Sequence, residues 1–299
     1  MQDRYAGDIG DFGKLGFLRE LRAAGFSIGI NWYKTEIKTE KNTDGRYTAY
    51  SQYRECDPEL YDALMGIVEH GRSIATIEDA RLIEGCVYYD APVPVTEKDR
   101  TAWQKEALKV LHDQNLVFLD PDNGLIVDSV SRKSEKRIKY ALYDEVLDYL
   151  EQSQTVIIYN HRSRKQENEY FHSIEEKLIN RVFTDSEMIL KISFPRFSVR
   201  DYFVVCPSIE HVKRIREVFK KMNDGIWRTS GMCRLPENGV SQIDDSISLN
   251  ETAEARFYCT LRKETLSLLR KYCLMADTTT SQAIQKILDE NLERAIEEL

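Results

Sequence analysis

Short apolar runs and longer amphipathic segments alternate along the first 223 residues of the chain. Apolar runs of about four to eight residues predict strands, and apolar residues three or four apart predict helices. The predicted strands are Ser27–Tyr33, Ser73–Ile77, Val87–Tyr89, Leu116–Leu119, Thr155–Tyr159, Glu187–Phe194 and Asp201–Cys206. The predicted helices are Leu15–Leu21, Pro58–Glu69, Lys98–His112, Ala141–Glu151, Asn168–Val182 and Ile209–Met222.

The order of these elements predicts an α/β fold with a Rossmann-like sheet. Strands separated by helices are expected to pair in parallel, because the helix supplies the long crossover connection that a parallel pair needs. The last two strands are joined only by the turn Pro195–Arg200, so they are expected to pair antiparallel. Alternating strand–helix units that end in an antiparallel hairpin resemble the class I methyltransferase fold. Topology alone does not define a function.

A second, smaller unit is expected at the C-terminus. Residues 1–235 form the predicted α/β domain, 236–254 a polar linker, and 255–299 the small unit. Arg256–Leu261 alternates apolar and polar residues as a strand does, and two helices follow it. The second helix begins with the capping-box pattern Thr279–Gln282. Strand, helix and capped helix together resemble the ribbon-helix-helix (MetJ/Arc) family.

This resemblance implies a homodimer that binds DNA. A single strand cannot bury its apolar side alone, so the unit is expected to pair with a second copy. In such proteins the paired strands enter the major groove. The outward residues Arg256, Tyr258 and Thr260 are therefore the candidate DNA contacts. A dimerisation element without DNA contact is the alternative.

Composition narrows the class of protein. The chain has 299 residues, of which 42% are hydrophobic and 31% charged, as in ordinary globular proteins. No apolar stretch approaches a membrane span, and the N-terminus lacks a signal-peptide core. The six cysteines form no CxxC pair, so neither a zinc site nor a disulfide framework is predicted. A cytoplasmic location without membrane contact is the resulting expectation.

The strand Leu116–Leu119 ends abruptly in Asp120, Pro121, Asp122 and Asn123. Ligands of open α/β sheets bind beyond the carboxyl ends of the strands. Asp120, Asp122 and Asn123 are thus candidate catalytic residues, and they are expected to contribute little to the core. His161, after the strand Thr155–Tyr159, is the candidate general base because histidine titrates near neutrality. An acidic turn that merely solvates the strand end is the alternative.

Basic residues follow the strands that end at this same sheet edge. The net charge is −8, yet Ser131–Lys139 holds five basic residues and one acidic residue. The basic side chains expected to converge are Lys133, Lys136, Arg137, Arg162, Arg164 and Arg196. Such a cluster would attract a phosphate-bearing substrate, including a nucleic acid. Solvated surface loops are the alternative explanation.

Two segments resemble the methyltransferases that modify an adenine amine in large-subunit ribosomal RNA. Ala6, Gly7, Asp11 and Lys14 match their N-terminal motif, and Asp120–Asn123 stands at their Asp-Pro-Pro-Tyr motif. The resemblance implies that Asp120 and the Pro121 carbonyl accept hydrogen bonds from the adenine amine, and that S-adenosylmethionine is the cofactor. The chain departs from the motif because Asp122 replaces the second proline and Asn123 the stacking aromatic residue. No glycine-rich cofactor loop follows the first strand.

Three functions stay open at this point. In a methyltransferase-like enzyme acting on nucleic acid, Lys14, Arg162 and Arg164 would hold phosphates, whereas Asn31, Glu78 and Asp120 would contact the cofactor. In a metal-dependent nuclease or phosphoesterase, Asp120 and Asp122, with His161 nearby, would bind Mg²⁺ or Mn²⁺. The third possibility is a DNA-binding transcription regulator whose large domain senses a ligand.

Overall fold

The computed structural model describes residues 1–35, 45–131, 134–162 and 165–236, together with residues 272, 283, 284, 286 and 287. Most of the predicted C-terminal unit, with Arg256, Tyr258 and Thr260, lies outside the described residues. Lys133 and Arg164 lie outside them as well. Ala283, Ile284, Lys286 and Ile287 are helical, where the second helix of that unit is predicted. The ribbon-helix-helix unit stays a prediction.

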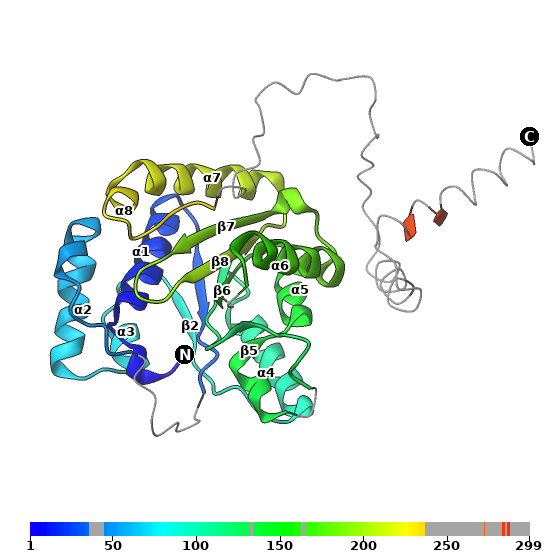
Figure 1. Cartoon of the computed structure of the whole chain (residues 1–299). Coiled ribbons are helices and arrows are strands. Elements are labelled where there is room, and N and C mark those ends of the chain that lie inside the picture. Colours follow the sequence, from blue (N-terminus) through cyan, green and yellow to red (C-terminus); the bar gives the residue numbers. More distant parts are fainter. Residues whose placement is uncertain are drawn as a thin grey trace, which may run out of the picture.

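The described chain is a mixed α/β structure (Figure 1). Its α-helices are α1 (Ile9–Ala23), α2 (Pro58–His70), α3 (Ile74–Asp79), α4 (Glu97–Val110), α5 (Tyr143–Glu151), α6 (Glu167–Val182), α7 (Ile209–Asp224) and α8 (Ile226–Thr229). Its strands are β1 (Ile28–Asn31), β2 (Val87–Tyr89), β3 (Leu116–Leu119), β4 (Gly124–Leu125), β5 (Tyr140–Ala141), β6 (Thr155–His161), β7 (Ile189–Phe194) and β8 (Arg200–Val205).

Within the described residues, six strands form one sheet in the order β2-β1-β3-β6-β8-β7. The first four of these are parallel, and β8 runs antiparallel to both β6 and β7. The predicted hairpin is therefore confirmed, and its turn lies at the same edge as the carboxyl ends of β3 and β6. The strand order reverses between β1 and β3, which is where open α/β sheets bind ligands.

Side chains of the sheet alternate between two hydrophobic cores. On β3, Leu116 and Phe118 pack into one core, and Val117 and Leu119 into the other. The first core is completed by α1, α2, α3 and α7, and the second by α4, α5 and α6 (Figure 1). Burial on both sides explains why the central strands are continuous apolar runs. The fold is thus a sheet with helices on both sides.

One predicted strand is wrong. Ser73–Ile77 lies in the region of helix α3, and its alternation Ser-Ile-Ala-Thr-Ile also fits a helical repeat, with Ile74 and Ile77 on one side. The Ser73 side chain accepts the amide N–H of Thr76, which is the standard cap at the start of a helix. Both isoleucines are buried. Glu78 therefore belongs to a helix and does not follow a strand.

Helix α1 begins earlier than the sequence indicated. Asp8 caps it by accepting the amide N–H of Asp11, so the glycine-rich segment is helical from Ile9 onward. A Cβ atom on Gly10 would lie 2.6 Å from the guanidinium group of Arg200. On Gly16 it would lie 2.2 Å from the Trp227 ring. The glycines thus allow the side chains of Arg200 and Trp227 to pack directly against the helix.

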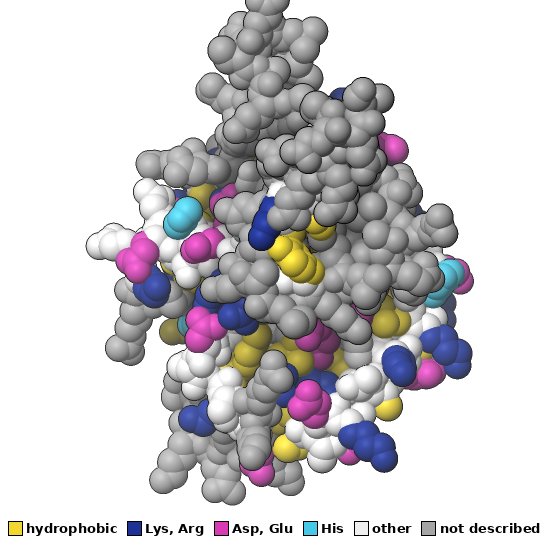
Figure 2. Space-filling model, turned by 90° about the vertical axis from the view of Figure 1, so that its right-hand side faces the viewer, with side chains coloured by type: hydrophobic (Ala, Val, Ile, Leu, Met, Phe, Trp, Pro, Cys, Tyr) yellow, Lys and Arg dark blue, Asp and Glu magenta, His cyan; other side chains and the backbone are white. Residues whose placement is uncertain are grey.

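The described surface is polar and mixed in charge. Acidic and basic side chains are interspersed on the side of the molecule that Figure 2 shows, as expected for 42 basic and 50 acidic residues. None of the helices in the described ranges combines the length and the apolar character that crossing a membrane requires.

Candidate functional site

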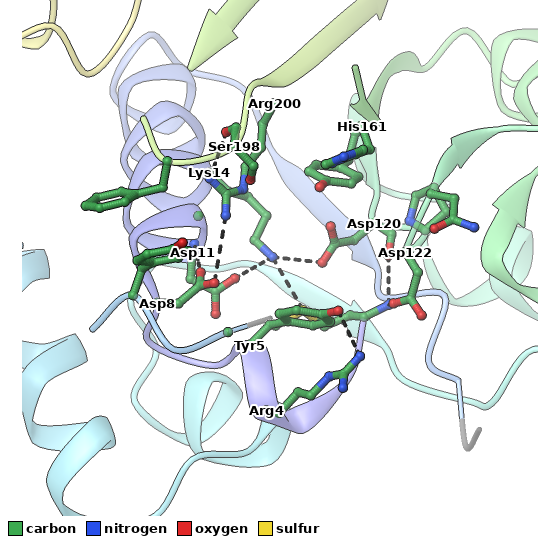
Figure 3. A pocket seen from close by; sticks show the side chains of 18 of the residues that line it. Arg4, Tyr5, Asp8, Asp11, Lys14, Asp120, Asp122, His161, Ser198 and Arg200 are labelled. Carbon is green, nitrogen blue, oxygen red and sulfur yellow. Dashed lines mark hydrogen bonds and ion pairs between the residues drawn. The ribbon is translucent and has the colours of Figure 1, made fainter. Parts of the chain in front are cut away.

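A cavity of about 360 Å³ lies at the carboxyl ends of β3 and β6, beside the N-terminal end of α1 (Figure 3). This volume is at the lower end of the range of small-molecule sites, which is about 300 to 1,000 Å³. Its lining residues are Met1, Arg4, Tyr5, Asp8, Gly10, Asp11, Lys14, Gly45, Tyr47, Asp120, Pro121, Asp122, Asn123, Lys139, Tyr159, His161, Phe197, Ser198, Arg200 and Tyr202. The two segments carrying the methyltransferase resemblance, far apart in sequence, meet here.

Lys14 joins these two segments through a buried ion-pair cluster. Its ammonium group lies 2.7 Å from Asp11 and 2.8 Å from Asp120, and Figure 3 shows it reaching between them. Lys14 is 3% exposed and Asp120 5%. Asp120 is therefore not the solvated acidic turn of the alternative interpretation, because it is buried and its charge is paired inside the protein. This pairing favours a larger contribution to stability than the sequence predicts.

Burial shifts the pKa values within this cluster. Desolvation raises the pKa of Asp11 to about 6, against the opposing effect of the Lys14 charge. Asp8 and Asp120 add to the rise because they are negative neighbours. For Lys14, burial lowers the pKa, but the charges of Asp11 and Asp120 outweigh burial and raise it overall. At neutral pH, Lys14 is thus a fixed positive charge, and Asp11 is a carboxyl that titrates near neutrality.

Asp122 has a different set of partners on the other side of the β3 end. The Met1 ammonium group lies 3.3 Å from its carboxylate, Gln2 donates to it at 2.5 Å, and Thr35 at 3.1 Å. Burial raises the pKa of Asp122, but the Met1 charge and the Gln2 hydrogen bond lower it overall. Asp122 is therefore an ionised carboxylate that ties the N-terminal segment to the sheet.

The N-terminal segment occupies the point where the strand order reverses. The Met1 ammonium group donates to the carbonyls of Trp32, Tyr33 and Asp120, at 2.9, 3.1 and 2.9 Å. The first two carbonyls follow β1 and the third follows β3. The crevice between these strand ends is thus partly filled by the chain itself. The cavity lies to one side of it, over β3, β6 and the β7–β8 turn.

Several residues predicted for the site do not line the cavity. Asn31 donates to the Tyr149 hydroxyl at 3.2 Å, and Glu78 accepts the indole N–H of Trp32 at 2.7 Å. Arg162 makes a bidentate ion pair with Asp201 and a further one with Glu167. These three side chains therefore make contacts within the protein and do not line the cavity. The predicted residues that do line it are Lys14, Asp120, Asp122, Asn123 and His161.

Of the six basic side chains expected to converge at this edge, the four that the structure describes do not line the cavity, and two other cations do. Lys139 lines it, 3.9 Å from Asp122, and Arg200 lines it from the start of β8. Arg196 donates to the Ser230 carbonyl and lies over the Tyr53 ring, away from the cavity. Lys136 and Arg137 are not among the lining residues. The converging cations are thus different from those expected.

Two of the lining residues, Arg4 and Phe197, belong to no sequence pattern that indicates a site. Arg4 lies at the edge of the cavity, and its guanidinium donates to the Tyr5 hydroxyl at 3.0 Å. Phe197 is an exposed aromatic residue in the β7–β8 turn. Neither belongs to a motif, and only the packing of distant segments brings them to the site.

No protein-family model matches the chain, and no curated protein is significantly similar to it. The assignment of a function consequently depends on the residues of the site.

The raised pKa of Asp11 gives a testable pH dependence of stability. Because its folded pKa of about 6 exceeds the ordinary value of 3.8, its stabilising contribution is complete below about pH 4 and is lost as the pH rises through 6. Relative to Asp11→Asn, the wild type should lose up to about 3 kcal/mol of unfolding free energy between pH 4 and 7. Urea unfolding across this range measures it.

Asp113→Asn is the control for this experiment, because the Asp113 side chain is 93% exposed. Its pH profile should follow that of the wild type. Parallel profiles for the wild type and Asp11→Asn would show that Asp11 has the same proton affinity in the folded and unfolded states.

Proposed function

We propose that this cavity is the active site of a nucleic-acid-modifying enzyme that acts on a base. The observation that carries the proposal is the placement of Asp120. Its carboxylate lies at the end of β3 in the cavity wall, and Lys14 holds it from the protein side through Oδ2. A carboxylate can accept about four hydrogen bonds, so Asp120 keeps acceptor capacity for a ligand. An exocyclic amine of a base is a donor that suits it.

The charges around the cavity suit a ligand with a polar base and a phosphate. Inside, the carboxylates of Asp11 and Asp120 are balanced by Lys14. At the edge, the Arg4 guanidinium donates to the Tyr5 hydroxyl, and its Nε has no hydrogen-bond partner among the described residues. A planar guanidinium group recognises a phosphate through paired hydrogen bonds. The arrangement therefore favours a base held inside, with its phosphate near Arg4.

S-adenosylmethionine is the cofactor that the resemblance implies, but its predicted contacts do not fit. Asn31 and Glu78 are used by Tyr149 and Trp32, and only Asp120 lines the cavity. Gly45, which follows the first strand, packs against the backbone of Arg4, since a Cβ there would lie 2.4 Å from the Arg4 carbonyl oxygen. The proposal of base modification therefore depends on no step through this cofactor.

The metal-dependent alternative is less favoured by the donors present. Asp120 and Asp122 would supply Mg²⁺ with oxygen ligands, yet Lys14 already neutralises the first and the Met1 ammonium group the second. In the described part of the chain, no group of three or more histidine, cysteine, aspartate or glutamate residues has the arrangement of a metal site.

The C-terminal unit is proposed as the element that dimerises the protein and holds DNA.

The test compares full-length wild type with Asp120→Asn on mixed RNA and DNA. Each is incubated with and without S-adenosylmethionine and Mg²⁺, and the nucleosides are analysed by mass spectrometry. We expect nucleosides whose base has a changed mass. The rate at which they form should be about 100-fold lower in Asp120→Asn, the scale of losing one positioned catalytic group. The amide still accepts the hydrogen bond from Lys14, so the variant should stay folded.

Asp113→Asn, at an exposed position, should retain full activity. Strand cleavage that requires Mg²⁺ would replace the proposal with the nuclease. A wild type that neither binds nor changes any nucleic acid would contradict both.

A further inference from the structure

Two exposed aromatic rings stand together in the wall of the cavity. Tyr47 is 49% exposed and Phe197 is 52% exposed, although both line the cavity. Their ring centroids are 4.3 Å apart and the ring planes differ by 26°, so the rings are stacked. They come from segments 150 residues apart in the chain. A stacked, solvent-facing pair is a platform on which another flat ring can continue the stack.

Phe197 occupies this position at an energetic cost. Its φ is +63°, in the left-handed region that residues other than glycine rarely adopt. The amide N–H of Ser198 donates to the Arg196 carbonyl at 2.9 Å and closes a three-residue turn around it. Such turns with positive φ are rare and strained. Strain of this kind persists where the surrounding structure holds it, and it concentrates at functional sites.

The surrounding structure does hold both rings. Arg200 donates to the carbonyls of Arg196 and Ser198, each at 3.2 Å, on either side of Phe197. Its guanidinium lies 3.8 Å from Asp8, the residue that caps α1. The Tyr47 carbonyl accepts the amide N–H of Ile9, the first residue of α1, at 2.9 Å. The start of α1 therefore positions the two aromatic residues independently.

We infer that the Tyr47–Phe197 pair stacks an unpaired base of a single-stranded nucleic acid. This inference builds on the proposed function, because it names the form of the substrate. A base offers its flat side only when it has left the duplex stack. Asn123, at the end of β3, has no ring to stack on that base, whereas the Tyr47–Phe197 pair, which also lines the cavity, supplies one. The guanidinium group of Arg4 supplies charge complementarity to the adjoining phosphate.

The test uses the full-length protein and a short single-stranded oligonucleotide that carries one iodouracil. Irradiation couples this base to an aromatic ring stacked on it, and mass spectrometry identifies the residue. We expect coupling to Tyr47 or Phe197. We also expect Phe197→Leu and Tyr47→Leu to weaken binding by about 10-fold, the scale of losing one base–aromatic stack. Leucine keeps an apolar side chain and the same backbone strain, so only the ring is removed.

Phe197→Trp should restore affinity and coupling, and Val95→Ala, at a 57% exposed position, should change neither. The duplex form of the oligonucleotide should not couple at these residues. The stacking inference alone would be overturned if the wild type binds and modifies the oligonucleotide but couples to it at other residues. Phe197→Leu would then bind it with unchanged affinity. Absence of binding by the wild type would overturn the proposed function with it.

Discussion

Replacing Lys14 with methionine is expected to lower the free energy of unfolding by about 3 to 5 kcal/mol at pH 7, the cost of breaking a buried ion pair. Lys14 is 3% exposed and contacts the carboxylates of Asp11 and Asp120 at 2.7 and 2.8 Å. Methionine fills a similar volume, so packing changes little. The loss arises because the carboxyl groups of Asp11 and Asp120 are left buried beside each other without their counter-ion.

The measurement is urea unfolding at pH 7 and at pH 4.5. The deficit should shrink at the lower pH, because Asp11 takes up a proton below its raised pKa of about 6 and its charge disappears. Arg54→Met is the control: Arg54 pairs with Asp62 on an exposed surface, and its loss should cost no more than about 1 kcal/mol. An equal deficit at both pH values would point to packing instead of charge.

This cluster also changes the meaning of variants at Asp120. Asp120→Ala would leave Lys14 with Asp11 as its remaining carboxylate in the cluster, so a loss of activity in that variant would mix chemistry with stability. Asp120→Asn separates the two, because the amide oxygen still accepts a hydrogen bond from Lys14 while the negative charge is removed. Asp120→Asn is therefore the better variant for the activity test.

Local patterns predicted most of the sheet. Leu116–Leu119 is a strand in the sequence analysis and in the structure, because a buried apolar run between turn residues has few alternatives. The hairpin also followed from the sequence, since its connection is too short for a crossover. Ser73–Ile77 was mistaken because five residues fit both repeats. The helix is favoured over the strand by the Ser73 cap and by Asp3, which accepts the amide N–H of Ile74 at 2.9 Å.

The composition of the site was only partly predictable. Sheet topology placed Asp120, Asp122, Asn123 and His161 at one edge, and the structure brings them to one cavity. The pairing of Lys14 with Asp120 spans 106 residues, and no local pattern carries such information. Phe197 gave no signal because the segment Arg196–Ser198 lacks a glycine or asparagine that would announce a turn with positive φ. Its exposure depends on contacts from Arg200, which only the tertiary structure reveals.

Arg162→Leu is expected to destabilise the protein by about 3 to 5 kcal/mol while leaving its nucleic-acid affinity unchanged. Asp201 is fully buried, and Arg162 donates to both of its carboxylate oxygens, at 2.8 and 2.6 Å. Ser193 and Glu167 complete this network, which ties the end of β6 to β7, β8 and α6. Removing the guanidinium leaves the Asp201 charge buried without its cation.

Arg4→Leu should give the opposite result, which makes it the matched comparison. Arg4 is at the cavity edge, and its loss should change stability by no more than about 0.5 kcal/mol. Its loss should also reduce the salt dependence of single-strand binding by about 0.7 in the log–log slope, the contribution of one phosphate contact. Urea unfolding and binding titrations over a salt series measure the two variants side by side. A reduced slope in folded Arg162→Leu would return this residue to the phosphate-binding role that the sequence suggested.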